Sequence, residues 1–136
     1  MMPVSVNSDI EVLLNMRSVA VVGCSPKPER PSHRIAAYLI EEGYRVYPVN
    51  PGHREILGRR CWPSLSDIEE SIDFVDVFRK PECVPDIVDE AIALGVKGLW
   101  LQDGVDHPAA VSKARAAGLV VVADDCVMRQ HLSRFR

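Results

Sequence analysis

The sequence predicts an α/β fold in which helices cover both faces of a mainly parallel sheet. Short apolar runs rich in Val and aromatic residues recur along the chain, and segments with apolar residues at helical spacing lie between them. Strands that alternate with helices are joined by right-handed crossovers, which place the helices on the two faces of one parallel sheet.

Five strands are predicted, each short and mostly apolar. Several are apolar at every position, as strands of a sheet covered on both faces are. They are Ser18–Val22, Arg45–Val49, Phe74–Phe78, Gly98–Leu101 and Leu119–Val122.

Three longer helices are predicted between the strands, and each ends at a glycine, which accepts the left-handed backbone of a helix end. They are Ser32–Gly43 with Ser32 as its N-cap, Glu82–Gly95, and Pro108–Gly118 with proline at its start. Shorter helical segments are predicted from the capping pattern at Ser8 and Glu11, from the same pattern at Ser66 and Glu69, and from Asp125 to about Leu132.

Composition and length bound the class of protein. The chain has 136 residues, of which 47% are hydrophobic and 26% charged. We expect one domain over residues 1–136, with a core of about 10–132. The formal net charge of −3 gives no general attraction to nucleic acid or to an anionic membrane. No apolar run approaches the roughly 20 residues of a membrane helix, and the N-terminus lacks a signal-peptide core, so we expect a cytoplasmic protein.

The elements together predict a single Rossmann-like, doubly wound domain whose five-stranded sheet has the order 3-2-1-4-5. In such a sheet, ligands bind beyond the carboxyl ends of the strands, near the point where the strand order reverses. The residues that follow each strand are therefore the candidates for a binding site.

The loop after the first strand predicts a phosphate site. Gly23 permits a tight turn, and the loop ends at a helix N-terminus, where free amides and the helix dipole favour an anion. Lys27 and Arg30 add positive charge, and Ser25 and Ser32 add hydroxyl donors. The alternative is a basic loop that is only solvated.

A dinucleotide-dependent oxidoreductase is the first alternative for a sheet of this kind, and two features oppose it. The loop is not G-x-G-x-x-G, because Gly23 is followed by prolines rather than by further glycines. The second strand ends in Asn50 and Pro51, without the acidic residue that binds an adenine ribose. Asn50 suits either a hydrogen bond to a ribose or base, or a simple turn before Pro51.

The cysteines do not predict a metal site. They are scattered, without a CxxC pair or a histidine at zinc-finger spacing, and are expected to be mostly small buried residues in a reducing compartment. Cys24 lies beside a helix N-terminus and cations, which would favour a thiolate and a mixed disulfide with a thiol ligand, but a buried and inert Cys24 is the preferred interpretation. The four are Cys24, Cys61, Cys83 and Cys126.

Five short motifs, in order and at the expected strand ends, resemble the small stand-alone CoA-binding proteins, whose fold is similar to the N-terminal CoA-binding domain of the succinyl-CoA synthetase alpha subunit. The resemblance covers about residues 10–132. The motifs are Gly23-x-Ser25…Arg30-x-Ser32, Val49-Asn50-Pro51, Asp76-Val-Phe78-Arg79, Leu99-Trp-Leu-Gln102-x-Gly104 and Asp125-Cys126.

The resemblance implies that coenzyme A or an acyl-CoA lies across the carboxyl edge of the sheet. The first loop would surround its phosphate-bearing part, through Gly23, Ser25, Lys27, Arg30 and Ser32.

The remaining motifs would hold the rest of the ligand. Asn50 and Pro51 would border the adenosine, and Phe78 and Arg79 would flank the pyrophosphate or the pantetheine arm. Gln102 and Gly104 would line the end where the thiol emerges, although Phe78 and Gln102 also suit a packing role.

The resemblance also bears on catalysis. The synthetase carries its phosphohistidine in a second domain, and this chain is too short for a counterpart of that domain. Nothing marks His33, His53, His107 or His131 as a substitute for the phosphohistidine, and no activating carboxylate can be placed beside His33 from sequence, so no catalytic residue is predicted.

We expect a CoA-binding module without its own chemistry. The alternatives are an NAD(P)-type oxidoreductase and an acyl-CoA-sensing protein that regulates a partner. A protein partner or homo-oligomer is compatible with the sequence; nucleic acid and membrane are not expected partners.

Overall fold

The computed structural model describes residues 5–136 and contains the predicted α/β domain. Five parallel strands form the main sheet, in the order β2-β1-β5-β6-β7. The strands are β1 (Ser18–Val22), β2 (Arg45–Val49), β5 (Phe74–Val77), β6 (Gly98–Leu101) and β7 (Val120–Val122). All five predicted strands are confirmed, and the third and fifth are each one residue shorter than expected.

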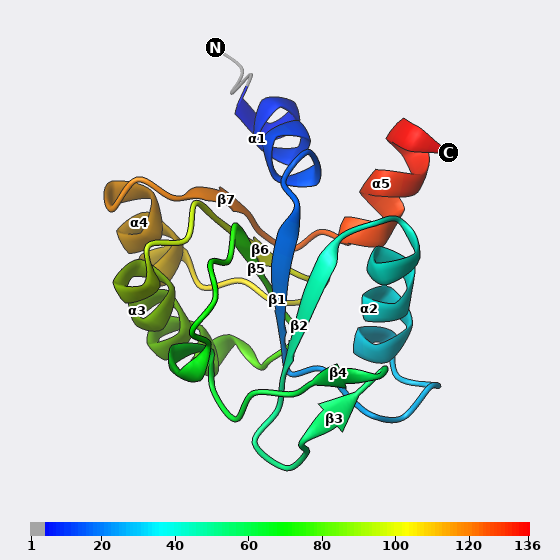
Figure 1. The fold of residues 1–136 in the computed structure, drawn as a ribbon. Helices are drawn as coiled ribbons and strands as arrows, with labels where there is room; N and C mark the ends of the chain where they lie inside the picture. Colours follow the sequence, from blue (N-terminus) through cyan, green and yellow to red (C-terminus); the bar gives the residue numbers. More distant parts are fainter. Residues whose placement is uncertain (1–4) are drawn as a thin grey trace.

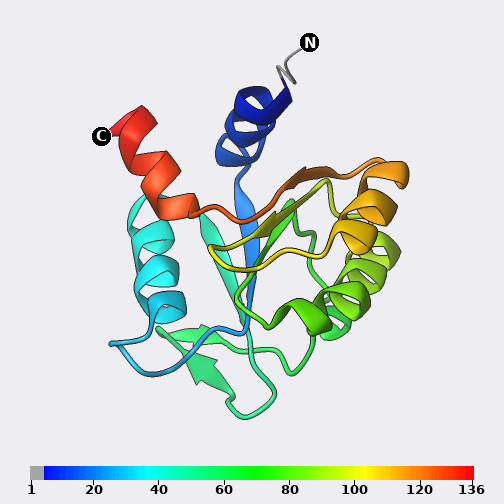
Figure 2. The same cartoon turned by 180° about the vertical axis from the view of Figure 1, so that it is seen from behind.

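Helices cover both faces of the sheet, as predicted (Figures 1 and 2). Helices α3 (Val84–Leu94) and α4 (Pro108–Ala116) pack on one face. The other face carries α1 (Ser5–Leu14), α2 (Pro31–Glu41) and α5 (Val127–Phe135). No helix among residues 5–136 is long and apolar enough to span a membrane.

The strand order differs from the predicted 3-2-1-4-5. The third strand of the main sheet, β5, pairs with the free side of β1, so the observed order corresponds to 2-1-3-4-5 and leaves β2 at the edge. Pro48 explains the edge position of β2, because a proline inside a strand has no N–H to donate to a further strand and is therefore tolerated at an edge. On the outer side of β2, the Trp62 amide donates to the Pro48 carbonyl at 3.0 Å.

The long segment between β2 and β5 contains only small elements. A hairpin of β3 (Glu55–Ile56) and β4 (Arg59–Arg60) is followed by the 3-10 turn η1 (Leu65–Asp67). The helix predicted from Ser66 and Glu69 is therefore only this short turn. A second 3-10 turn, η2 (Pro81–Cys83), precedes α3, so the helix predicted from Glu82 begins instead at Val84.

Three helix ends differ from the capping predictions. Arg30, not Ser32, occupies the N-cap of α2, and Ser32 lies inside the first turn, where its hydroxyl accepts from the Ser25 amide of the preceding loop. Helix α1 begins at Ser5, so Ser8 lies within it, because helical packing against the core outweighs the local capping signal. Helix α5 begins at Val127 and continues to Phe135, beyond the predicted Leu132.

A candidate ligand site at the carboxyl edge of the sheet

The strand order reverses between β1 and β5, and two predicted site residues meet there. Gly23 follows β1 with a φ of +87°, and a Cβ at this position would lie only 2.7 Å from the carbonyl oxygen of Phe78, which follows β5. The amides of Gly23 and Cys24 both donate to the Val49 carbonyl at the end of β2. The first loop is thus anchored to the ends of two neighbouring strands at the point where open α/β sheets bind ligands.

The hydroxyl groups of the first loop hold the loop in place. The Ser32 Oγ accepts from the Ser25 amide at 2.9 Å, and the Ser25 Oγ accepts from the Lys27 amide at 3.1 Å. The His33 ring donates to the Ser25 carbonyl at 2.9 Å. The side chains of Lys27 and Arg30 are exposed in front of the N-terminus of α2. The cations of the loop are therefore accessible, whereas its serines have a structural role in this conformation.

Asn50 connects the loops that follow β1 and β2. Its Nδ2 donates to the Cys24 carbonyl and its Oδ1 accepts from the Gly52 amide, both at 2.9 Å. Both ends of the side-chain amide are therefore engaged, as the turn interpretation predicts. The neighbouring Pro51 is exposed at this end of the sheet.

A groove of about 410 Å³ lies between the start of α2 and the start of α5, and we call it the α2–α5 groove. It brings together the predicted Phe78, Arg79 and Gln102. Gly104 does not line it, and its amide donates to Asp124 at 2.8 Å. The lining residues are Pro31, Arg34, Ile35, Phe78, Arg79, Gln102, Asp103, Val105 and Cys126.

Gln102 has a structural contact as well as a free donor. It is only 4% exposed, and its Oε1 accepts from the Val127 amide at 3.1 Å, which satisfies the first turn of α5. Within the described part of the chain, its Nε2 makes no hydrogen bond. A neutral donor therefore lines the α2–α5 groove without a partner.

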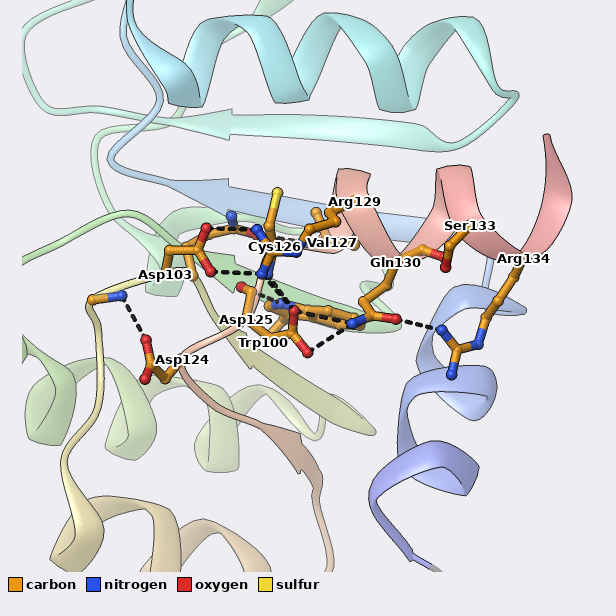
Figure 3. A network of polar contacts seen from close by, with 12 residues as sticks. Trp100, Asp103, Asp124, Asp125, Cys126, Val127, Arg129, Gln130, Ser133 and Arg134 are labelled. Carbon is orange, nitrogen blue, oxygen red and sulfur yellow. Dashed lines mark hydrogen bonds and ion pairs between the residues drawn. The ribbon is translucent and has the colours of Figure 1, made fainter.

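A network of ion pairs fixes α5 beside this groove (Figure 3). Arg129 makes two hydrogen bonds of 2.9 Å to Asp103, which holds the pKa of that carboxyl below its usual value, and a third to Asp125. Asp125 also accepts from Gln130, which contacts Arg134, whose guanidinium reaches α1. The charge of Asp103 is thus paired rather than free at the groove.

On the other side of Arg79 lies a second groove of about 280 Å³, between the end of β2 and α3, which we call the β2–α3 groove. Arg79 lines both grooves, and its guanidinium contacts the Cys83 sulfur at 3.6 Å. Three carboxylate residues line the second groove, namely Glu82, Asp86 and Glu90. Anionic groups are therefore better accepted in the α2–α5 groove.

The β3–β4 hairpin contributes cations that the sequence interpretation missed. A third groove, of about 580 Å³, is lined by Pro51, His53, Arg54 and Arg60 among others. The pairing of Glu55 with Arg60 folds these arginines together, and Arg60 stacks on Trp62 with 3.8 Å to the ring centroid. Leu57 and Gly58 form the turn of this hairpin, and both have a positive φ. The glycine at position 58 was the sequence signal for such a turn.

Two buried groups lie behind the site. Asp76 of β5 is fully buried, and neither carboxyl oxygen has a hydrogen-bond partner among the described residues, so burial raises its pKa well above the usual value. Cys24 is fully buried as well, and burial raises the pKa of its thiol to about 12. The expectation that Cys24 is buried is confirmed, and this burial opposes formation of its thiolate.

The geometry does not assemble a nucleophile, a base and an orienting group within residues 5–136. Besides His33, two other histidines make structural bonds: His107 accepts from the Ala110 amide and caps α4, and His131 bonds to Tyr38 at 2.6 Å. Residues 5–136 also contain no group of three or more side chains that could together bind a metal ion. What the edge offers is exposed cationic side chains, the N-terminus of α2 and a mostly apolar groove.

Proteins similar to this chain in sequence or in structure include two without an assigned function and one CoA ligase. An uncharacterized protein of Bacillus subtilis is 34% identical, with 89% of this chain and 90% of that protein aligned. The ADP-forming acetate–CoA ligase I of Archaeoglobus fulgidus is 30% identical over 87% of this chain, but the chain spans only 19% of that ligase. A hypothetical protein from Pyrococcus horikoshii OT3 has a structure with a TM-score of 0.90 and 43% identity, covering 98% of this chain and 96% of that one.

The resemblance inferred from the strand-end motifs is thereby confirmed, with acetate–CoA ligases among the relatives. The model of the CoA binding domain matches residues 17–131, which include every predicted site residue. Since that match covers most of the chain, the protein belongs to the CoA-binding domain family.

Proposed function

We propose that this chain binds coenzyme A or an acyl-CoA along the carboxyl edge of its sheet and performs no catalysis with its own residues. The observation that carries the proposal is the family match over residues 17–131, because it includes the carboxyl ends of all five strands of the main sheet. The geometry supports it with a cationic loop, a glycine at the strand reversal and an adjoining groove.

The ligand's anionic half would lie where positive charge and free amides meet. Lys27 and Arg30 face solvent before the N-terminus of α2, and Arg34 lies on the first turn of that helix. Guanidinium groups bind phosphate oxygens with paired hydrogen bonds, and helix N-termini favour anions. The pyrophosphate would therefore lie between Gly23 and α2.

The adenosine half would lie toward the hairpin. Pro51 lines both the β2–α3 groove and the third groove at the hairpin, in which Arg54 and Arg60 provide cations for a further phosphate. Asn50 would act by holding the two loops together, because both ends of its amide are engaged.

The pantetheine arm would follow the α2–α5 groove. Phe78, Ile35 and Val105 offer apolar contact there, and the unpartnered Nε2 of Gln102 suits an amide carbonyl of the arm. Gly104 would lie beyond the groove, near the thiol end.

Isothermal titration calorimetry with CoA, dephospho-CoA and NAD tests the ligand class. We expect CoA to bind more tightly than both, because dephospho-CoA lacks one phosphate and NAD lacks the pantetheine arm. If CoA bound no better than NAD, the CoA assignment would fall and the NAD(P)-type alternative would gain. Turnover in a hydride-transfer or thioester assay that Arg30→Ala abolishes would overturn the absence of catalysis.

An acyl-CoA-sensing role is the second candidate, and exposed apolar side chains favour it. Val12 of α1 is 45% exposed, and Leu132 and Phe135 of α5 are 39% and 49% exposed. Both helices lie at the end of the sheet opposite the hairpin (Figure 1). Recovery of a bound protein that dissociates when CoA is added would support this role; binding that ignores CoA would not.

A further inference from the structure

The third groove, beside the β3–β4 hairpin, is lined by cations and by no carboxylate residue among those described. Arg54 and Arg60 line it, and neither makes an ion pair among residues 5–136. Carboxylate residues line both other grooves. The volume of about 580 Å³ is within the range of small-molecule sites. This end of the carboxyl edge therefore suits an anionic ligand.

The guanidinium of Arg60 lies between a buried indole and this groove. Its Cζ is 3.8 Å from the centroid of the Trp62 ring. Trp62 is only 5% exposed and belongs to the core, whereas Arg60 is exposed and lines the third groove. Because a guanidinium is planar, the indole covers one of its faces and the opposite face is left to the groove.

Main-chain hydrogen bonds fix the indole beneath Arg60. The Trp62 amide donates to the Pro48 carbonyl at 3.0 Å, and the Trp62 carbonyl accepts from the Asn50 amide at 2.9 Å. Trp62 also pairs with Val49 in a parallel bridge. The contact between indole and guanidinium is therefore attached to the end of β2, at the carboxyl edge of the main sheet.

We infer that the outer face of Arg60 is the stacking surface for the adenine base of the ligand, an inference that rests on the proposed function. A guanidinium stacks on aromatic rings through its face, so indole, guanidinium and adenine would form three layers. Pro51 lines the same groove and offers the base an apolar contact. The N–H donors of Arg60 lie in the guanidinium plane, so stacking leaves them for a phosphate.

A stack of this kind recognises the base by its flat surface and not by the hydrogen-bonding groups at its edge. Arg60 would thus select ligands that carry a base together with phosphates. The α2–α5 groove would select the pantetheine arm independently, because it lies on the other side of Arg79.

Calorimetry with Arg60→Lys tests the inference, because lysine keeps the positive charge and loses the planar face. We expect CoA to bind about three- to tenfold more weakly, which is the scale of a cation–π contact. The loss should persist for dephospho-CoA, which keeps the base and lacks the 3′-phosphate. It should disappear for 4′-phosphopantetheine, which has no base. A loss confined to ligands with the 3′-phosphate would overturn the inference, because Arg60 would then serve only that phosphate.

Arg59 offers the matched control. It precedes Arg60 on β4, so its side chain leaves the opposite face of the hairpin, and its Nη1 donates to the Leu57 carbonyl at 3.2 Å. Arg59→Lys should leave the affinity for CoA unchanged. Equal losses in the two variants would overturn the inference, because the effect would then not depend on the guanidinium over Trp62.

A second measurement needs no variant. In 1,N6-etheno-CoA the hydrogen-bonding edge of the adenine is blocked and its flat surface is kept, so this analogue should bind the natural chain nearly as tightly as CoA. Binding at least about tenfold weaker, the scale of a lost hydrogen bond, would show that the base is recognised by its edge and would overturn the inference.

The titration of the natural chain with CoA separates this inference from the proposed function. If CoA binds the natural chain and Arg60→Lys equally well, the stacking surface is wrong and the binding function stands. If CoA does not bind the natural chain, the proposed function fails and the inference fails with it.

Discussion

Replacing Gly23 by alanine tests the geometry of the point where the strand order reverses. At Gly23 the φ angle is +87°, and an added Cβ would lie 2.7 Å from the Phe78 carbonyl oxygen. A left-handed backbone costs a residue with a Cβ about 1–2 kcal/mol, and overpacking against the backbone of a central strand adds about 1–3 kcal/mol. We expect Gly23→Ala to lower the free energy of unfolding by roughly 2–5 kcal/mol.

Gly118 provides the matched control for this variant. Its φ is +95°, but a Cβ there would meet nothing within 4 Å, so Gly118→Ala should lose only the backbone cost of about 1–2 kcal/mol. Urea unfolding followed by the fluorescence of the buried Trp62 and Trp100 measures both losses. Equal losses in the two variants would refute the reasoning, because the contact with Phe78 would then contribute nothing.

Three further substitutions test single groups. Arg30→Ala should weaken CoA binding by roughly 1.5–3 kcal/mol in calorimetry, the range of a hydrogen bond to a charged group, and most of this loss should vanish for a ligand that lacks the contacted phosphate. The exposed Arg59 of β4, which lies outside the first loop, is the control, and an equal loss in Arg59→Ala would contradict a specific phosphate contact. Asp76→Asn should flatten the pH dependence of stability. Since burial raises the pKa of Asp76 in the folded state, folding takes up a proton, and the natural chain loses stability as pH rises from about 4 toward that raised pKa. Urea unfolding across this range checks it, and a parallel decline in the variant would disprove it. Gln102→Met should lower the free energy of unfolding by about 1–2 kcal/mol, because the buried Val127 amide loses its acceptor; an unchanged urea midpoint would exclude that role.

Asp76 occupies a position in the sheet where a carboxyl group lowers the stability of the fold. It lies in the central strand, opposite Val21 on one side and Trp100 on the other, with no hydrogen bond among the described residues. An unpaired buried carboxyl is unfavourable, and an apolar residue of similar size would pack there without that cost. The pH experiment therefore measures directly what the fold loses by keeping this acid.

The sequence predicted the strands well because a buried parallel strand carries its signal in its own residues. β1, β2 and β6 begin and end where their apolar runs do. The end of α3 is also encoded in its own residues, since Gly95 adopts the left-handed backbone that the sequence pattern predicts. The resemblance to CoA-binding domains rested on motifs at these strand ends, and it too was readable before the structure.

The roles of individual site residues were less predictable because their partners are distant in sequence. Ser32 was expected to cap its own helix, but its hydroxyl binds the amide of Ser25. Gln102 contacts α5, which lies 25 residues further on. Arg54 and Arg60 reach the edge only because a two-stranded hairpin folds them back beside Pro51. A side chain's choice of hydrogen-bond partner depends on such neighbours and not on local periodicity.

By itself, the amino-acid sequence determined the α/β class, the five strands, the cationic first loop and the family, because periodicity and short motifs are properties of contiguous residues. Only the tertiary structure decided that β5 lies beside β1, which places the strand reversal between Gly23 and Phe78. It also decided that Cys24 and Cys61 are buried whereas Cys83 and Cys126 are half-buried. Both outcomes depend on how crossovers pack over the sheet, and the free energy of that packing is shared among residues far apart in the chain.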